Sequence, residues 1–154
     1  MVKGTKKYPQ DVMNERVKGF ENKSRSAGLK ITHQRVEVYK ALIESDEHPS
    51  AEMIFRKVRQ VIPTISLDTV NRTLLTFSDV GIAFIVEGSG DVKRFDGNLE
   101  NHQHFKCIKC KSIVDFSCEP IEDIKIPADI RRRFKVLRKT IYIEGICDLC
   151  EGKN

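Results

Sequence analysis

The sequence lacks any long apolar run, and its longest stretches are only a few residues, too short to span a bilayer. We therefore predict no membrane partner. The basic residues near the N-terminus are not followed by an apolar core, so they do not form a secretory signal, and the expected compartment is the cytoplasm. Low-complexity segments are also absent, and the only internal repeat is a pair of Cys-x-x-Cys motifs.

Cationic residues exceed anionic residues by a small margin. The 154 residues include 27 Lys or Arg and 22 Asp or Glu, which gives a net charge of +5 and a pI of about 9.0. This favours a nucleic-acid partner, though only mildly. A hydrophobic content of 40% with 32% charged residues is typical of a soluble globular protein, and the length allows one domain or two small ones.

Four amphipathic helices are predicted in the first half of the chain. The first runs from Gln10 to about Ala27 and ends at Gly28. The other three follow residue types that cap helix N-termini well, and a proline stops the third: the caps are Thr32, Ser50 and Ser66, and the proline is Pro63.

After the fourth predicted helix, the spacing of apolar residues changes from that of a helix to that of β-strands in a hairpin. Residues 82–86 and 92–95 are predicted as strands, joined by a turn over 87–91 that contains two glycines. A winged helix-turn-helix domain has this order of elements, several helices followed by a two-stranded hairpin. We therefore predict an α+β protein with a DNA-binding winged-helix domain over residues 1–96, a hinge over 97–101 and a second domain over 102–154.

The fourth predicted helix has an apolar face with Leu67, Val70, Leu74 and Phe77, and a polar face with Thr69, Asn71, Arg72, Thr73 and Thr76. Short polar side chains with one arginine suit a helix in the DNA major groove. Considered alone, this face is explained more simply as solvated helix surface. The predicted hairpin, which forms the wing of such a domain, adds Lys93. The candidate DNA contacts are therefore Arg35, Ser66, Thr69, Asn71, Arg72 and Lys93.

The second domain is predicted to be a small α/β unit. Strand-like segments cover 105–108, 113–116, 134–137 and 140–143, and a short helix covers 126–133 with Pro127 in its first turn. A domain of about fifty residues has too small a core to be secure alone. It therefore needs a metal, a partner subunit or both.

Four of the five cysteines form the two Cys-x-x-Cys pairs, Cys107 with Cys110 and Cys147 with Cys150. In a reducing cytoplasm this spacing favours metal ligands over disulfides, and four thiolates suit tetrahedral Zn(II). The alternative is a thiol-disulfide enzyme, whose Cys-x-x-Cys normally opens a helix, but neither pair precedes a predicted helix. The remaining cysteine, Cys118, is interpreted as a partly buried small hydrophobe.

A second group of metal-binding residue types surrounds the first cysteine pair. His102 and His104 are two apart, so on an extended segment both side chains point the same way. With Asp96 before them and Asp115 after, these donors suit Fe(II), Mn(II) or Zn(II). Taken alone, His48 is interpreted as a surface residue, since a site that included it would have to join the two domains.

Several segments together resemble the ferric uptake regulator family over about residues 28–150. They are Gly28–Arg35, His48–Glu52, Ile65–Val70, Arg94–Asp96, His102–His104 and Cys107–Phe116. The resemblance implies a homodimeric repressor that binds a double-stranded DNA operator, with an N-terminal winged helix and a C-terminal α/β dimerisation domain. It also implies a structural zinc site on the four paired cysteines and a regulatory Fe(II) or Mn(II) site on His48, Asp96, His102, His104 and Asp115.

Within this family the chain is most similar to the peroxide-sensing (PerR) branch, because positions 96 and 115 hold Asp rather than Glu. That branch implies that peroxide oxidises His48 or His102 in the Fe(II) form, which releases the metal and then the DNA. Two departures matter. Asn71 stands where the family usually has Tyr, which puts the operator sequence in doubt. Residues 137–139 lack a further His that relatives often carry, which weakens a third metal site.

Two other functions could use the same residues. A repressor of the same family could respond reversibly to iron or zinc, with peroxide irrelevant. A metal-dependent hydrolase would need a substrate pocket and an acid or base beside an open metal position. No unassigned carboxylate or nucleophile motif is placed for that, so the chain is not expected to be an enzyme.

Overall fold

The computed structural model describes residues 8–45, 48–86, 92–100, 102–117, 124–136 and 139–152. The chain divides into two compact units, Met1–Leu99 and Glu100–Asn154, and the boundary falls within the segment predicted as a hinge. Among the described residues, no helix combines the length and the apolar character needed to cross a membrane.

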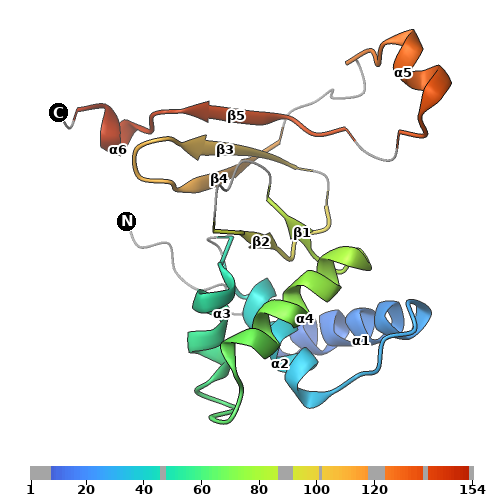
Figure 1. Ribbon diagram of the computed structural model, residues 1–154. Helices are drawn as coiled ribbons and strands as arrows, with labels where there is room; N and C mark the ends of the chain where they lie inside the picture. Colours follow the sequence, from blue (N-terminus) through green and yellow to red (C-terminus); the bar gives the residue numbers. More distant parts are fainter. Residues whose placement is uncertain are drawn as a thin grey trace. The chain divides into compact units, whose positions relative to one another are not determined.

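In the described residues of the N-terminal unit, the chain forms four helices and a two-stranded antiparallel sheet (Figure 1). The helices are α1 (Gln10–Ser26), α2 (His33–Ile43), α3 (Ala51–Val58) and α4 (Leu67–Asp79), and the strands are β1 (Phe84–Ile85) and β2 (Phe95–Asp96). This arrangement confirms the predicted winged helix-turn-helix order. The glycine-containing turn over 87–91 lies outside the described residues.

Helices α2, α3 and α4 begin at the predicted caps. The side-chain oxygens of Thr32, Ser50 and Ser66 each accept the backbone N–H three residues further on, at 3.3, 3.3 and 3.1 Å. Each cap satisfies a donor that the helix itself leaves unpaired. Gly28 stops α1 in the left-handed region with φ 72°, and the next N–H, from Leu29, donates to the Ser24 carbonyl at 2.8 Å.

The core of the N-terminal unit draws buried side chains from all four helices and the hairpin. They include Phe20, Val38, Leu42, Ile54, Val58, Val70, Leu74, Phe77, Ile82 and Phe95. The Phe20 ring stacks on Tyr39 with centroids 4.5 Å apart and meets Phe77 edge-on at 5.3 Å. This packing fixes α4 against α1 and α2 through its apolar face.

Two residues of α4 occupy faces other than those predicted. Leu67 is 43% exposed, because it is the first residue of the helix and extends beyond the core. Thr73 is only 8% exposed, because it lies three residues after Val70 and four before Phe77, on the buried side of the helix. The predicted polar face is therefore narrower than expected.

Helix α3 is shorter than predicted. It ends at Val58, and the chain reaches Pro63 through turns in which the N–H groups of Gln60 and Val61 bond three residues back, at 3.2 and 3.0 Å. Such tightened turns are common where a helix ends ahead of a proline.

The part of the C-terminal unit that the structure describes contains a three-stranded sheet and two short helices (Figure 1). Its strands are β3 (Gln103–Cys107), β4 (Ile113–Phe116) and β5 (Tyr142–Gly145), and its helices are α5 (Ala128–Arg133) and α6 (Asp148–Glu151). The strand order is β4-β3-β5, with β3 antiparallel to β4 and parallel to β5. A parallel pair needs a crossover, and the chain between β4 and β5 passes through α5.

The start of β5 is set by a buried side chain. Gln103 is 1% exposed, and its Oε1 accepts the backbone N–H of Ile141 at 2.6 Å. An unpaired buried amide would cost on the order of 1–3 kcal/mol, so this bond fixes the chain just before β5.

The predictions for β4 and for a short helix after Pro127 are confirmed. The last strand begins two residues later than predicted, since Ile141 bonds to the Gln103 side chain before the ladder starts. Residues 134–136 form no strand, and residue 137 lies outside the described part. Phe134 and Val136 alternate with charged residues, but they are 56% and 40% exposed and pair with no strand among the described residues.

Gly145 stands where a larger residue does not fit. A Cβ at this position would lie 2.9 Å from Cε2 of Phe105. We expect Gly145→Ala to lower the free energy of unfolding by about 1–3 kcal/mol, the usual cost of overpacking, as measured by urea denaturation. The control is Gly19→Ala in α1, where no atom lies within 4 Å and a gain of about 0.5–1 kcal/mol is expected. Equal stability of the two variants would contradict the close packing at Gly145.

Candidate metal centres

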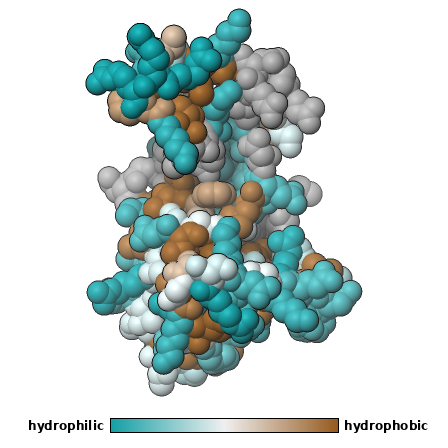
Figure 2. All heavy atoms as spheres, turned by 90° about the vertical axis from the view of Figure 1, so that its right-hand side faces the viewer, coloured by the Kyte–Doolittle hydropathy of each residue, from teal (hydrophilic) through white to brown (hydrophobic). Residues whose placement is uncertain are grey.

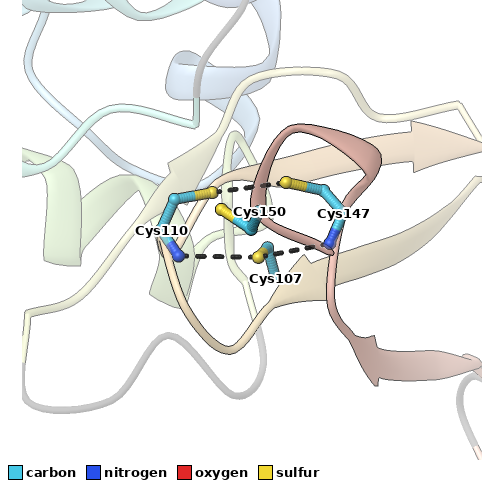
Figure 3. Close-up of side chains that lie close together, drawn as sticks. All are labelled: Cys107, Cys110, Cys147 and Cys150. Carbon is cyan, nitrogen blue, oxygen red and sulfur yellow. Dashed lines mark hydrogen bonds between the residues drawn. The ribbon is translucent and has the colours of Figure 1, made fainter. Parts of the chain in front are cut away.

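The two Cys-x-x-Cys pairs meet at one end of the C-terminal sheet (Figure 3). Cys107 is the last residue of β3 and Cys110 lies in the turn that follows, whereas Cys147 precedes α6 and Cys150 lies within it. Their four sulfur atoms all lie within 4.8 Å of one another. The structure therefore brings together the four cysteines predicted to share a zinc ion.

Backbone hydrogen bonds shape this cluster from both sides. The N–H groups of Cys147 and Cys110 point at the Cys107 sulfur at 3.4 and 3.5 Å. The N–H of Ile108 donates to the Gly145 carbonyl at 2.8 Å, and the N–H of Lys111 donates to the Cys107 carbonyl at 2.9 Å. Two turns are thus held against each other at the ends of the parallel strands β3 and β5.

The four thiols differ in acidity. The N–H groups of Cys147 and Cys110 lower the pKa of Cys107 to about 6, and the Ser112 hydroxyl lowers the pKa of Cys110. Hydrogen bonding with the Cys147 thiol, followed by burial, raises the pKa of Cys150 to about 12. The hydrogen bonds around Cys107 therefore favour its thiolate, the form that binds a metal, whereas a metal that also binds Cys150 must displace its proton.

The geometry fits a tetrahedral zinc ion. Zinc–sulfur bonds of about 2.3 Å in a tetrahedron place the sulfurs about 3.8 Å apart. The sulfurs of Cys110 and Cys147 are 3.7 Å apart. One expectation is wrong: the second pair does open a helix, since Cys147 is the N-cap of the four-residue α6. All four sulfurs nevertheless converge, which a two-thiol redox site does not require.

In the N-terminal unit, His48 and Asp96 form a buried pair. The Nε2 of His48 lies 3.7 Å from Oδ2 of Asp96, and the side chains are 4% and 7% exposed. The other oxygen of Asp96 accepts the backbone N–H of Asn98 at 2.7 Å. This pair supplies one nitrogen and one carboxylate donor.

His48 is not the surface residue that its local sequence suggests. The N–H of Phe95 donates to the Pro49 carbonyl at 3.0 Å, and Ser50 forms an antiparallel bridge with Arg94. These contacts draw the segment after α2 alongside β2 and bury His48, whose φ is 45°. The pairing is non-local, so the residues around His48 do not predict it.

In the C-terminal unit, His102, His104 and Asp115 converge. The two Nε2 atoms are 3.1 Å apart, and they lie 3.8 and 3.6 Å from Oδ1 of Asp115. His104 and Asp115 face each other across β3 and β4, and His102 directly precedes β3. The prediction that both histidines point the same way along an extended segment is confirmed.

The ring orientation of His102 suits metal binding. Its Nδ1 lies 2.7 Å from the Glu100 carbonyl, which can only accept, so Nδ1 carries the proton and Nε2 is left as the electron-pair donor. Metal-bound histidines commonly hold their second nitrogen in this way. Two imidazoles and one carboxylate form a donor set suited to Fe(II), Mn(II) or Zn(II).

The candidate DNA contacts lie in the N-terminal unit. On α4, Thr69 and Asn71 are half-buried and Arg72 is exposed, with its Nη1 3.9 Å from Oδ2 of Asp68. The Ser66 hydroxyl is engaged in capping α4 and lies 2.9 Å from the Thr69 hydroxyl. The remaining two are Arg35, which donates to the Lys30 carbonyl, and Lys93, which is exposed after the hairpin turn.

A groove that the sequence pattern did not indicate runs beside α4. It has a volume of about 590 Å³ and lies between the starts of α3 and α4 and the segment entering β2. Asn71 and Lys93 line it together with the exposed Leu67 and Val92. It therefore extends from α4 to the segment that enters β2.

Comparison with known proteins assigns the family. A model of the "Ferric uptake regulator family" matches residues 26–144. The peroxide-responsive repressor PerR of Staphylococcus aureus (strain Mu50) is 35% identical over 129 residues, which cover 84% of this chain and 87% of that protein.

Solved structures agree with this fold. The Vibrio cholerae ferric uptake regulator is 27% identical with a TM-score of 0.66 and covers 82% of this chain and 98% of its own. The Helicobacter pylori regulator, at 23% identity, has a TM-score of 0.72 with 97% of each chain covered. The fold, the clustered cysteines and these matches together show that the chain belongs to the ferric uptake regulator family and is a metal-responsive repressor of that family.

Proposed function

We propose that this chain is a peroxide-sensing repressor, in which five donors from the two units share one regulatory metal. The observation that carries the proposal is the convergence of His102, His104 and Asp115, together with the buried pair of His48 and Asp96. The N-terminal unit supplies two of these donors and the C-terminal unit three, so neither unit alone can complete an octahedral site. The S. aureus relative at 35% identity is named as peroxide-responsive.

The four cysteines are proposed to hold a structural Zn(II). Their role is to crosslink the ends of β3 and β5, which stabilises a unit whose described residues include few fully buried apolar side chains. Structural zinc sites contribute on the order of 10 kcal/mol to folding at neutral pH. Zn(II) has no redox chemistry, which suits a site that must persist under peroxide.

The regulatory site is proposed to set the angle between the units. His48 and Asp96 bind from the N-terminal unit, and His102, His104 and Asp115 from the C-terminal unit. In a homodimer this angle fixes the separation of the two recognition helices, which must match about one helical turn of DNA or a multiple of it. Metal binding and operator binding are then linked, and each strengthens the other.

Base contacts in the major groove are assigned to three residues of α4, the half-buried Thr69 and Asn71 and the exposed Arg72. Ser66 and Arg35 at the helix starts, and Lys93 on the wing, are assigned to the phosphate backbone. Such a repressor acts in the cytoplasm, where its DNA is.

Fe(II) held by these ligands would supply the redox chemistry that cleaves peroxide, whereas Mn(II) would supply the same charge without that chemistry. One peroxide oxygen would add to the imidazole of His48 or His102, the other would leave as water, and the oxidised ring would bind the metal less well. The alternative within the family, reversible corepression by iron or zinc, requires the same ligands but no histidine oxidation.

The zinc assignment is tested by removing one sulfur. Cys150→Ser is expected to lower bound zinc from about one per chain to near zero by elemental analysis, because three thiolates leave the tetrahedron incomplete. Cys118→Ser, at a position outside the described residues, is the matched control and is expected to retain its zinc. Zinc loss in the control but not in Cys150→Ser would refute the ligand set.

The regulatory ligands are tested through DNA binding. Asp115→Ala is expected to weaken binding about 10–100-fold at a fixed Mn(II) concentration, the usual effect of losing a group that binds or orients a metal. The DNA probe is a duplex selected from a random pool with the Mn(II)-loaded protein, and affinity is measured by fluorescence anisotropy. His33→Ala, on the exposed first turn of α2, should bind like the parent chain. Parent-like binding by Asp115→Ala would exclude Asp115 as a regulatory ligand.

Peroxide sensing is tested by mass spectrometry of the Fe(II)- and Mn(II)-loaded protein after mild peroxide treatment. We expect one added oxygen on the peptide with His48 or the peptide with His102, in the iron form only. The peptide with His33 serves as the internal control. Oxidation confined to cysteines, or metal-dependent DNA binding that peroxide leaves unchanged, would favour reversible corepression instead.

A further inference from the structure

Positive charge is concentrated around α5, far from the predicted recognition helix in sequence. Residues 124–139 contain seven Lys or Arg and one acidic residue, Asp129. Since the whole chain carries a net charge of +5, all other residues together carry a net charge of −1. The basic character of this protein therefore comes from one segment of the C-terminal unit.

Five Lys and Arg side chains of this segment are exposed, and they form no ion pair with a described carboxylate. We define the α5 basic surface as Lys125, Arg131, Arg132, Arg133 and Lys135, all of which are exposed. Within the described ranges, no carboxylate lies within 4.0 Å of their side-chain nitrogens. Three arginines of the N-terminal unit differ, because each lies within 4.0 Å of an acidic residue four positions earlier: Arg25 on α1, Arg56 on α3 and Arg72 on α4.

Helix stabilisation does not account for this charge. Basic residues in the last turn of a helix gain about 0.3–1 kcal/mol from the helix dipole, but α5 has only six residues and three adjacent arginines. At 3.6 residues per turn, three neighbours spread over more than half the circumference, so one acidic face cannot pair them all. In Figure 2, viewed from the right-hand side of Figure 1, hydrophilic side chains project over the α5 region beside an apolar patch.

The folded part of the recognition unit has no net charge with which to attract DNA. Residues 8–99 contain 13 Lys or Arg and 13 Asp or Glu, and the excess positive charge of this unit comes from three lysines before them, Lys3, Lys6 and Lys7. On α4 the one cation, Arg72, lies beside Asp68. Duplex DNA carries one negative charge per roughly 1.7 Å, and phosphate contacts supply most non-specific affinity. A DNA-binding protein of this charge distribution needs a second cationic surface.

We propose that the α5 basic surface binds the phosphate backbone of duplex DNA outside the bases read by α4. The proposal rests on the DNA-binding function proposed above. Arginine suits this role, because its planar guanidinium donates two parallel hydrogen bonds to one phosphate. The contact carries no sequence information and needs no regulatory metal, so it adds affinity and not specificity.

The test replaces the three arginines in the full-length chain. Arg131→Gln, Arg132→Gln and Arg133→Gln together remove three charges and keep residues that favour a helix. Affinity of the metal-free protein for a random-sequence duplex is measured by anisotropy at several salt concentrations. We expect at least a tenfold loss at low salt, and a slope of log affinity against log salt that is shallower by about 2–3, near 0.9 per lost phosphate contact.

Two control variants isolate the surface. Lys18→Gln, Lys23→Gln and Arg25→Gln together remove the same charge from exposed positions on α1, and the slope should change by less than half as much. Replacing the three arginines of α5 by lysine keeps the charge and should keep the slope, which separates charge from misfolding.

An unchanged slope in the glutamine variant, or an equal loss in the α1 control, would overturn the proposal. Binding to vesicles with anionic lipid that depends on α5, while duplex binding does not, would also overturn it and identify a membrane contact. The proposed sensing function fails on a different measurement: metal-dependent binding to a selected duplex. Either proposal can therefore fail while the other holds.

Discussion

The C-terminal unit depends on one constraint, the convergence of four sulfurs that joins the ends of β3 and β5. The strand β3 spans only Gln103 to Cys107, yet it carries His104 near its start and Cys107 at its end. A rigid sulfur cluster at one end therefore fixes the direction in which His104 and its cross-strand partner Asp115 present their donor atoms. In the proposed repressor, the inert zinc site thus determines the geometry of the reactive one.

In the N-terminal unit, a histidine and a carboxylate, His48 and Asp96, are held close together and away from solvent. The peptide after His48 pairs with β2, and the side chain of Asp96 also bonds to the backbone of Asn98. Burying a charged carboxylate is costly unless hydrogen bonds and an opposite charge compensate for it. A metal cation is such a charge, so the buried pair is suited to a site whose occupancy changes the energy of the unit.

The sequence predicts the local features of this protein well, because they depend on residues close in the chain. The caps at Thr32, Ser50 and Ser66 follow from a side-chain oxygen three residues before an N–H, and the hairpin follows from the change to period two. What could not be predicted is non-local. The burial of His48 requires Phe95 to donate to Pro49, and the groove beside α4 requires Val92 to lie near Leu67. The residue type and the spacing of the four cysteines predict a shared metal site. They do not predict the helix that begins after Cys147, because a helix of four residues is too short to show a periodic spacing of apolar residues.

The separation of the two cysteine pairs has a kinetic consequence. Cys110 and Cys147 are 37 positions apart, and the parallel strands that bring them together form only after this long loop closes. Non-local closure of this kind is slow compared with the formation of single helices. Once the cluster closes without a metal, the surrounding N–H groups lower the pKa of Cys107 and favour its thiolate, and thiolates are the form that oxidants attack. Newly folded chains therefore pass through an interval in which zinc and oxidant compete for the same sulfur.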